Sequence, residues 1–132
     1  MNKEQLVAKA KEILVHSYSP YSNFPVGAAI LCNDGTIITG VNVENASFGG
    51  TNCAERSAIF TAVGLGYKKN NFLAIAIAGK TKSFLPPCCI CRQIMIEFFE
   101  PKTPVYLTNE AGDIAEYLLE DLVPLAFTQL EI

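Results

Sequence analysis

Two cysteine segments constrain the fold of this chain more than any other feature. The first is Cys53-Ala54-Glu55, and the second, much further along the chain, is Pro87-Cys88-Cys89-Ile90-Cys91. Cys88 and Cys91 are three positions apart, so on a helix their side chains share one face. Pro87 is typical of a helix entry, and Cys53 also stands at the start of a predicted helix. Two such helix N-termini can converge on one metal ion without strain.

Three thiolates and one carboxylate are the groups that a catalytic zinc site uses. Such a site typically keeps three protein ligands and leaves the fourth position for water. A nearby carboxylate that is not a ligand, here Glu55, can carry protons for that water. Two plainer alternatives exist: buried free cysteines are common core residues, and Asn52 with Glu55 has the spacing of a helix capping box. The joint spacing of all these residues favours the metal site.

The remaining cysteines and the charged neighbours fit around this site. Cys89 points to a different helical face from Cys91 and is predicted to pack in the interior, as is Cys32 at a strand end. Three thiolates leave a zinc shell with a net negative charge, which Arg56 and Arg92 are expected to offset by donating hydrogen bonds to sulfur. An exposed charge on the helix surface is the alternative for both arginines, above all for Arg92. His16, the only histidine, is expected to have a surface or core role.

The order of apolar segments predicts an α/β domain. Residues 3–17 and 53–65 have helical spacing, and Asn52 is a candidate N-cap of the second helix. Asn33-Asp34-Gly35 predicts a hairpin between strands 26–32 and 36–43. Residues 72–78 form a continuous apolar run, typical of a strand buried on both faces. A helix over 88–100, a strand over 105–108 and a short helix over 116–122 follow. This order predicts one domain over residues 1–132, a three-layer α/β/α arrangement with a mixed sheet.

Charge and composition exclude several functions. The net charge is −3 and the ten basic residues are scattered, whereas nucleic-acid binding usually leaves a basic patch. No apolar run approaches the roughly 18 residues of a membrane span, and no signal core follows the N-terminus. The count of five cysteines is odd, and three of them lie within residues 88–91. This arrangement fits metal binding in a reduced, cytoplasmic setting better than a disulfide framework. The 50% hydrophobic content favours an oligomer, and a tightly packed monomer is the alternative.

These residues resemble the small, homotetrameric type of cytidine deaminase, and the resemblance covers nearly the whole chain. The general zinc-deaminase pattern has Pro-Cys-x-x-Cys as its second half. The chain also carries the family's other motifs, which are Cys53-Ala54-Glu55-Arg56, Pro87-Cys88-x-x-Cys91-Arg92-Gln93, Tyr18-Ser19-Pro20-Tyr21-Ser22-x-Phe24-x-Val26-Gly27-Ala28-Ala29 and Gly40-x-Asn42-x-Glu44-Asn45.

The resemblance implies a role for each matched residue. It implies a central five-stranded mixed sheet and one Zn²⁺ per subunit, held by Cys53, Cys88 and Cys91. Glu55 would be the proton shuttle. The implied substrate contacts are Asn42 and Glu44 to the ribose, Phe24 to the base, Ala54, and Phe127, which would reach the active site of a neighbouring subunit.

The sequence departs from the family at two places. Cys89 and Ile90 stand where the family usually has Gly-Ala, which adds a thiol beside the metal ligands. Leu125 replaces the usual Gly before Ala126-Phe127, which bears on the path of the C-terminal tail and so on the reach of Phe127.

The resemblance predicts hydrolytic deamination of cytidine and 2′-deoxycytidine in pyrimidine salvage, with attack of zinc-activated water on C4 of the pyrimidine. A deaminase for a cytosine-containing antibiotic is an alternative, although Asn42 and Glu44 favour a ribose. A nucleotide or nucleic-acid deaminase is disfavoured because no phosphate-binding cluster is evident. A structural zinc module would need a fourth ligand, for which Cys89 or Cys32 is available.

Overall fold

The computed structural model describes residues 1–131 and contains a five-stranded sheet in the order β2-β1-β3-β4-β5. Strands β3 and β4 are parallel, and the other neighbouring pairs are antiparallel. The strands are β1 (Val26–Cys32), β2 (Ile37–Val41), β3 (Phe72–Gly79), β4 (Pro104–Thr108) and β5 (Ile114–Leu118), and the helices are α1 (Lys3–Glu12), α2 (Ala54–Gly64), α3 (Cys89–Phe98) and α4 (Leu119–Leu122).

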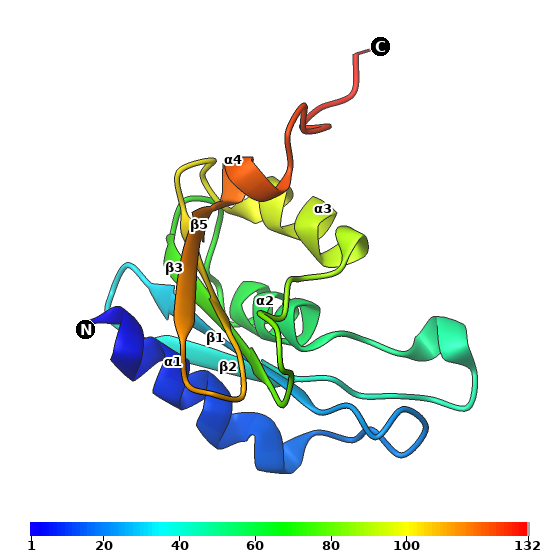
Figure 1. The fold of residues 1–132 in the computed structure, drawn as a ribbon. Helices are drawn as coiled ribbons and strands as arrows, with labels where there is room; N and C mark the ends of the chain where they lie inside the picture. Colours follow the sequence, from blue (N-terminus) through cyan, green and yellow to red (C-terminus); the bar gives the residue numbers. More distant parts are fainter. Residues whose placement is uncertain (132) are drawn as a thin grey trace.

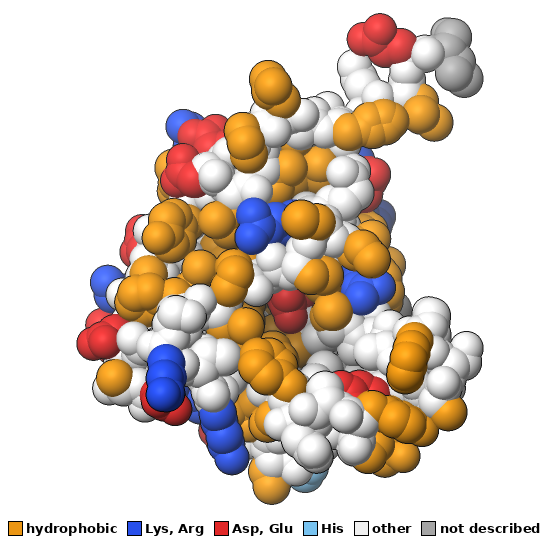
Figure 2. All heavy atoms as spheres, turned by 45° about the vertical axis from the view of Figure 1, so that its right-hand side comes forward, with side chains coloured by type: hydrophobic (Ala, Val, Ile, Leu, Met, Phe, Trp, Pro, Cys, Tyr) orange, Lys and Arg blue, Asp and Glu red, His pale blue; other side chains and the backbone are white. Residues whose placement is uncertain are grey.

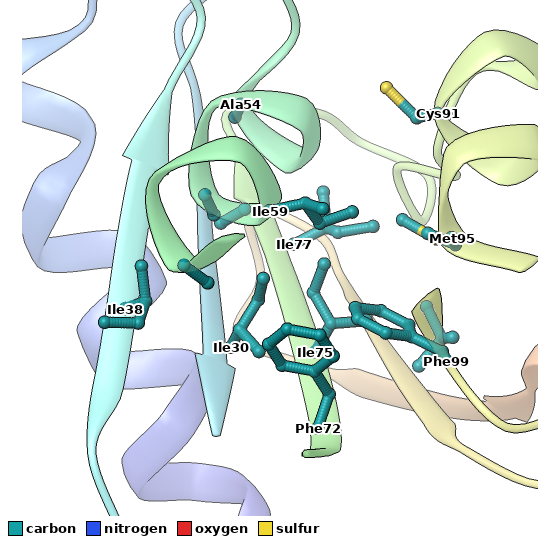
Figure 3. Packing of buried hydrophobic residues seen from close by; sticks show 14 of the residues in the cluster. Ile30, Ile38, Ala54, Ile59, Phe72, Ile75, Ile77, Cys91, Met95 and Phe99 are labelled. Atoms are coloured by element: carbon teal, nitrogen blue, oxygen red, sulfur yellow. The ribbon is translucent and has the colours of Figure 1, made fainter. Parts of the chain in front are cut away.

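Helices cover both faces of the sheet (Figure 1). Helix α1 lies on one face, where Leu6, Val7 and Ala10 pack against alanines of β1 and β3. Helices α2 and α3 lie on the other face over a larger core, which includes Ile75 and Ile77 of β3 (Figure 3). The central position of β3 explains its continuous apolar sequence, because both of its faces are covered. The predicted three-layer α/β/α fold is confirmed.

The hairpin between β1 and β2 forms where the sequence predicts it. Gly35 has a φ of 87°, a left-handed value that a side chain would disfavour. The Asp34 carboxylate accepts a hydrogen bond from the Thr36 backbone N–H at 3.0 Å. This tight turn sets the register in which Ala28 pairs with Gly40, and Gly40 is the point where α2 approaches the sheet.

The C-terminal third differs from the sequence prediction. Residues 114–118 form strand β5 at the sheet edge, and only Leu119–Leu122 are helical, so the predicted helix over 116–122 is wrong in its first half. Pairing with β4 explains the difference, because Tyr106 lies opposite Glu116 in an antiparallel ladder. Helix α1 ends at Glu12 and continues as a 3-10 turn over Ile13–His16. None of the helices in the described part of the chain is long and apolar enough to cross a membrane.

Candidate active site

The N-terminal ends of α2 and α3 meet on one side of the sheet and bring three cysteines together. The sulfur atoms of Cys53, Cys88 and Cys91 all lie within 4.8 Å of one another. The Sγ atoms of Cys53 and Cys88 are 3.7 Å apart. Two thiolates bound tetrahedrally to zinc at about 2.3 Å lie about 3.8 Å apart, so the donor set and its spacing fit a zinc ion.

Local helix capping explains how the sulfur atoms are aimed. Cys53, not Asn52, is the N-cap of α2, and its side chain makes no capping hydrogen bond. Asn52 instead donates to the Ser57 hydroxyl at 3.2 Å, so the capping box considered for Asn52 and Glu55 does not form. Cys88 is the N-cap of α3, and its sulfur accepts from the Cys91 backbone N–H at 3.3 Å. In Figure 3 the Cys91 side chain points from α3 toward the start of α2.

The two arginines behave differently. Arg56 donates from Nη2 to Cys53 Sγ at 3.2 Å, as the sequence predicts for a group that offsets thiolate charge. Its Nε is buried without a hydrogen-bond partner. Arg92 instead donates to the backbone carbonyls of Pro87 and Leu122, at 2.9 and 3.0 Å. The expected hydrogen bond from Arg92 to sulfur is therefore wrong. Through these two hydrogen bonds, Arg92 links Pro87, just before Cys88, to the end of α4.

Hydrogen bonds and burial set the protonation of the thiols. Hydrogen bonds from the Cys91 thiol, and then from Arg56 and Cys88, lower the pKa of the Cys53 thiol and favour its thiolate form. Cys91 is the donating partner of this pair, and that hydrogen bond together with burial raises its pKa. A thiolate in a positive environment beside a helix N-terminus is the form that binds a metal.

Cys89 and Cys32 lie outside the cluster. Cys32 is fully buried, as predicted, and burial raises the pKa of its thiol to about 11. Cys89 is exposed, so the prediction that it packs in the interior is wrong. As the first residue of α3 it lies on the solvent side of a helix that buries only Cys91 and Met95. With neither thiol in the cluster, the described residues do not form the closed four-cysteine site of a structural zinc module. His16 is exposed, in agreement with a surface role.

Glu55 lies at a cavity beside the cysteines. Only 4% of this residue is exposed, and burial raises the pKa of its carboxyl group to about 7. The cavity has a volume of about 350 Å³, within the usual range of small-molecule sites. The rest of the lining comes from the segment before β1, the loop after β2, the start of α2 and the loop before α3. It includes Phe24, Asn42, Glu44, Ala54, Leu85 and Cys88.

Asn42 and Glu44 are held at this cavity by hydrogen bonds to the segment before β1. The Asn42 side chain donates to the Phe24 carbonyl at 2.7 Å and accepts from the Val26 N–H at 2.9 Å. The Glu44 carboxylate accepts from the backbone N–H groups of Tyr21 and Ser22. Ser22 also lines the cavity. The sequence motif contained this serine, but sequence reasoning gave it no role.

Phe127 lies apart from the cavity. It is 53% exposed, in a tail that projects away from the body of the molecule (Figure 1). The Gln93 side chain donates to the Phe127 carbonyl at 2.9 Å, which holds the start of this tail. Within the described chain, Phe127 therefore does not join the site formed by the same subunit.

An open three-thiolate centre with a buried carboxylate beside a cavity is the site of a zinc-dependent hydrolytic enzyme. Known proteins narrow this class. The model of the cytidine and deoxycytidylate deaminase zinc-binding region matches residues 1–108. A cytidine deaminase of Sporosarcina psychrophila is 46% identical over 132 residues, which covers 100% of this chain and 96% of the relative. One from Halalkalibacterium halodurans is 47% identical, covering 97% of this chain and 96% of the relative.

Solved structures agree with these sequence relatives. A crystal structure of cytidine deaminase from Burkholderia pseudomallei has a TM-score of 0.94 and 48% identity, covering 96% of this chain and 100% of that chain. A cytidine deaminase from Mycobacterium tuberculosis has a TM-score of 0.82 and 34% identity, covering 98% of this chain and 99% of that one. The chain belongs to the cytidine deaminase family, whose known reaction is the hydrolytic deamination of cytidine. The resemblance inferred from the motifs is confirmed.

Proposed function

We propose that this chain is one catalytic domain that converts cytidine and 2′-deoxycytidine to the corresponding uridines, with Glu55 as its proton shuttle. The carrying observation is the buried Glu55 carboxyl beside three cysteine sulfurs, at a cavity that also contains Phe24, Asn42 and Glu44. Cys53, Cys88 and Cys91 would hold one zinc ion, which would supply Lewis-acid activation of the attacking water.

Glu55 has the environment that the proton transfers require. A carboxyl group with a pKa of about 7 can accept and release a proton near neutral pH. In the proposed reaction, water oxygen adds to C4 of the pyrimidine while Glu55 takes one water proton and delivers it to ring N3. Glu55 then moves the second proton to the amino group. The bond between C4 and that nitrogen breaks, ammonia leaves, and a carbonyl remains at C4.

The other lining residues would bind and orient the nucleoside. The Phe24 ring offers an apolar surface for the pyrimidine. Ala54, at the start of α2, lines the same cavity. Asn42 and Glu44 provide a donor and an acceptor for sugar hydroxyls. The cavity lining contains no Lys or Arg, so it favours a nucleoside over a nucleotide. The reduced thiols are compatible with action in the cytoplasm.

The deciding experiment compares the zinc-loaded wild type with Glu55→Gln. The wild type is expected to deaminate cytidine, as followed by ultraviolet absorbance. Glu55→Gln removes the proton carrier but preserves size, so it is expected to keep one zinc and lose activity by roughly 10²-fold or more. A zinc-loaded wild type without turnover would refute the function, and an active Glu55→Gln would refute the role of Glu55.

We also propose a homotetramer in which Phe127 reaches the active site of a neighbouring copy. One support is the projecting tail, in which Leu125 and Phe127 are exposed. A second is the set of hydrophobic side chains on the molecular face that Figure 2 shows. Light scattering tests the tetramer. A mixture of Phe127→Ala and Glu55→Gln chains tests the shared site, because mixed oligomers would restore a complete site. Activity no greater than the sum of the two variants alone would contradict it.

A further inference from the structure

The Glu44 carboxylate is held by three hydrogen bonds from two consecutive residues. Oε1 accepts from the backbone N–H of Tyr21 at 2.9 Å and from that of Ser22 at 3.0 Å. Oε2 accepts from the Ser22 hydroxyl. The Ser22 hydroxyl is the main cause that lowers the pKa of Glu44, with the two N–H groups contributing. Glu44 is therefore ionised at neutral pH and acts only as an acceptor.

The same Ser22 hydroxyl connects Glu44 to the segment that carries Phe24. Its oxygen accepts from the Phe24 backbone N–H at 3.1 Å, while its hydrogen is donated to Glu44. On the other side, the Phe24 carbonyl accepts from Asn42 Nδ2. Phe24, Asn42 and Glu44, three of the residues proposed to contact the substrate, are thus joined in one hydrogen-bond network, which the Ser22 side chain completes.

Counting donors and acceptors shows what this network leaves for a ligand. A carboxylate has about four lone-pair positions, and the chain fills three on Glu44, so one remains on Oε2. Asn42 Oδ1 accepts from the Val26 N–H and the Ser17 hydroxyl, at 2.9 and 2.5 Å. Asn42 Nδ2 uses one of its two hydrogens on Phe24. The sugar end of the cavity therefore offers one acceptor on Glu44 and one donor on Asn42.

We propose that Ser22 is a positioning residue for sugar recognition, whose hydroxyl fixes Glu44 Oε2 so that its free lone pair faces a sugar hydroxyl. The backbone N–H groups of Tyr21 and Ser22 bind only Oε1, so without the Ser22 hydroxyl the carboxylate could rotate and displace Oε2. Loss of the Ser22 hydroxyl would keep the charge and the anchor of Glu44 but lose the orientation of the atom that binds substrate. This proposal rests on the proposed nucleoside deaminase function.

The test measures kcat and KM of zinc-loaded wild type and Ser22→Ala on two substrates, cytidine and 2′,3′-dideoxycytidine. The second substrate lacks both ring hydroxyls that Glu44 could receive. Hydrogen bonds to charged groups contribute enough that misplacing one is expected to lower kcat/KM for cytidine by roughly five- to twenty-fold, mainly through KM. With dideoxycytidine, Ser22→Ala is expected to match the wild type within about twofold, because the affected interaction is absent.

Two further variants separate positioning from general damage. Ser22→Thr keeps a hydroxyl at the same atom and is expected to recover most of the cytidine activity. Ser83→Ala removes an exposed hydroxyl outside the cavity lining and is expected to leave kcat/KM unchanged for both substrates. If Ser22→Ala lowered kcat/KM equally for both substrates, or did not lower it for cytidine, this proposal alone would be overturned. Wild type without activity would overturn the proposed function and this proposal with it.

Discussion

A single methyl group at Gly40 is expected to disable the site from outside the cavity. Gly40 lies in β2 where α2 crosses it, and a Cβ built there would lie 2.4 Å from Ala58 N and 2.6 Å from Ala54 O. Both are backbone atoms, so no side-chain rotation relieves the contact. Ordinary van der Waals separation requires a shift of about 1 Å. That shift falls on the first turns of α2, which carry Cys53 and Glu55.

The expected losses of stability and of activity follow from this displacement. Overpacking of this kind typically costs about 1–3 kcal/mol of stability. Misplacing catalytic groups by about 1 Å can reduce the rate by roughly 10²-fold. Gly40→Ala is therefore expected to lower the unfolding midpoint and to reduce kcat/KM for cytidine about 10²-fold. The assay combines denaturant unfolding, zinc content and turnover of cytidine at matched zinc occupancy.

Gly64→Ala is the matched control. Gly64 is the last residue of α2, and a Cβ there meets nothing within 4 Å. Alanine is favoured over glycine in helices by up to about 1 kcal/mol, so this variant is expected to keep its activity and lose no stability. A Gly40→Ala protein with an unchanged unfolding midpoint and activity within about threefold of wild type would contradict the expected displacement of α2.

Three other predictions concern the metal and the thiols. Arg56→Gln removes the hydrogen bond to Cys53 Sγ and is expected to weaken zinc affinity by about tenfold, as measured by competition with a chelator. Arg92→Gln, which loses only hydrogen bonds to backbone carbonyls, is expected to retain zinc affinity, and equal weakening by both variants would contradict this distinction. Chelation of zinc is expected to abolish turnover, and added Zn²⁺ to restore it; activity that survives complete zinc removal would exclude zinc catalysis. A thiol reagent at pH 8 is expected to label the exposed Cys89 in the zinc-loaded protein. Cys32, whose buried thiol stays protonated below a pKa of about 11, is expected to react only on unfolding, and its rapid labelling in the folded state would contradict this.

The candidate residues for the chemistry could be found without a structure, because they depend on residue type and local spacing. Cys88 and Cys91 share a helix face at a spacing of three, and Asn33-Asp34-Gly35 forms the predicted hairpin. Motif resemblance supplied Asn42 and Glu44, which local periodicity does not single out. The same local rules placed helices α2 and α3 to within a few residues of their observed ends.

Tertiary structure decided everything that depends on contacts distant in sequence. The convergence of α2 and α3 brought Cys53 to 3.7 Å from Cys88 and buried Glu55 beside them. Pairing with β4 made residues 114–118 a strand, although a helix was predicted from residue 116 onward. The path of the chain left Cys89 exposed and turned Arg92 toward backbone carbonyls. Helical spacing shows which side chains share a face, but only packing decides what that face meets.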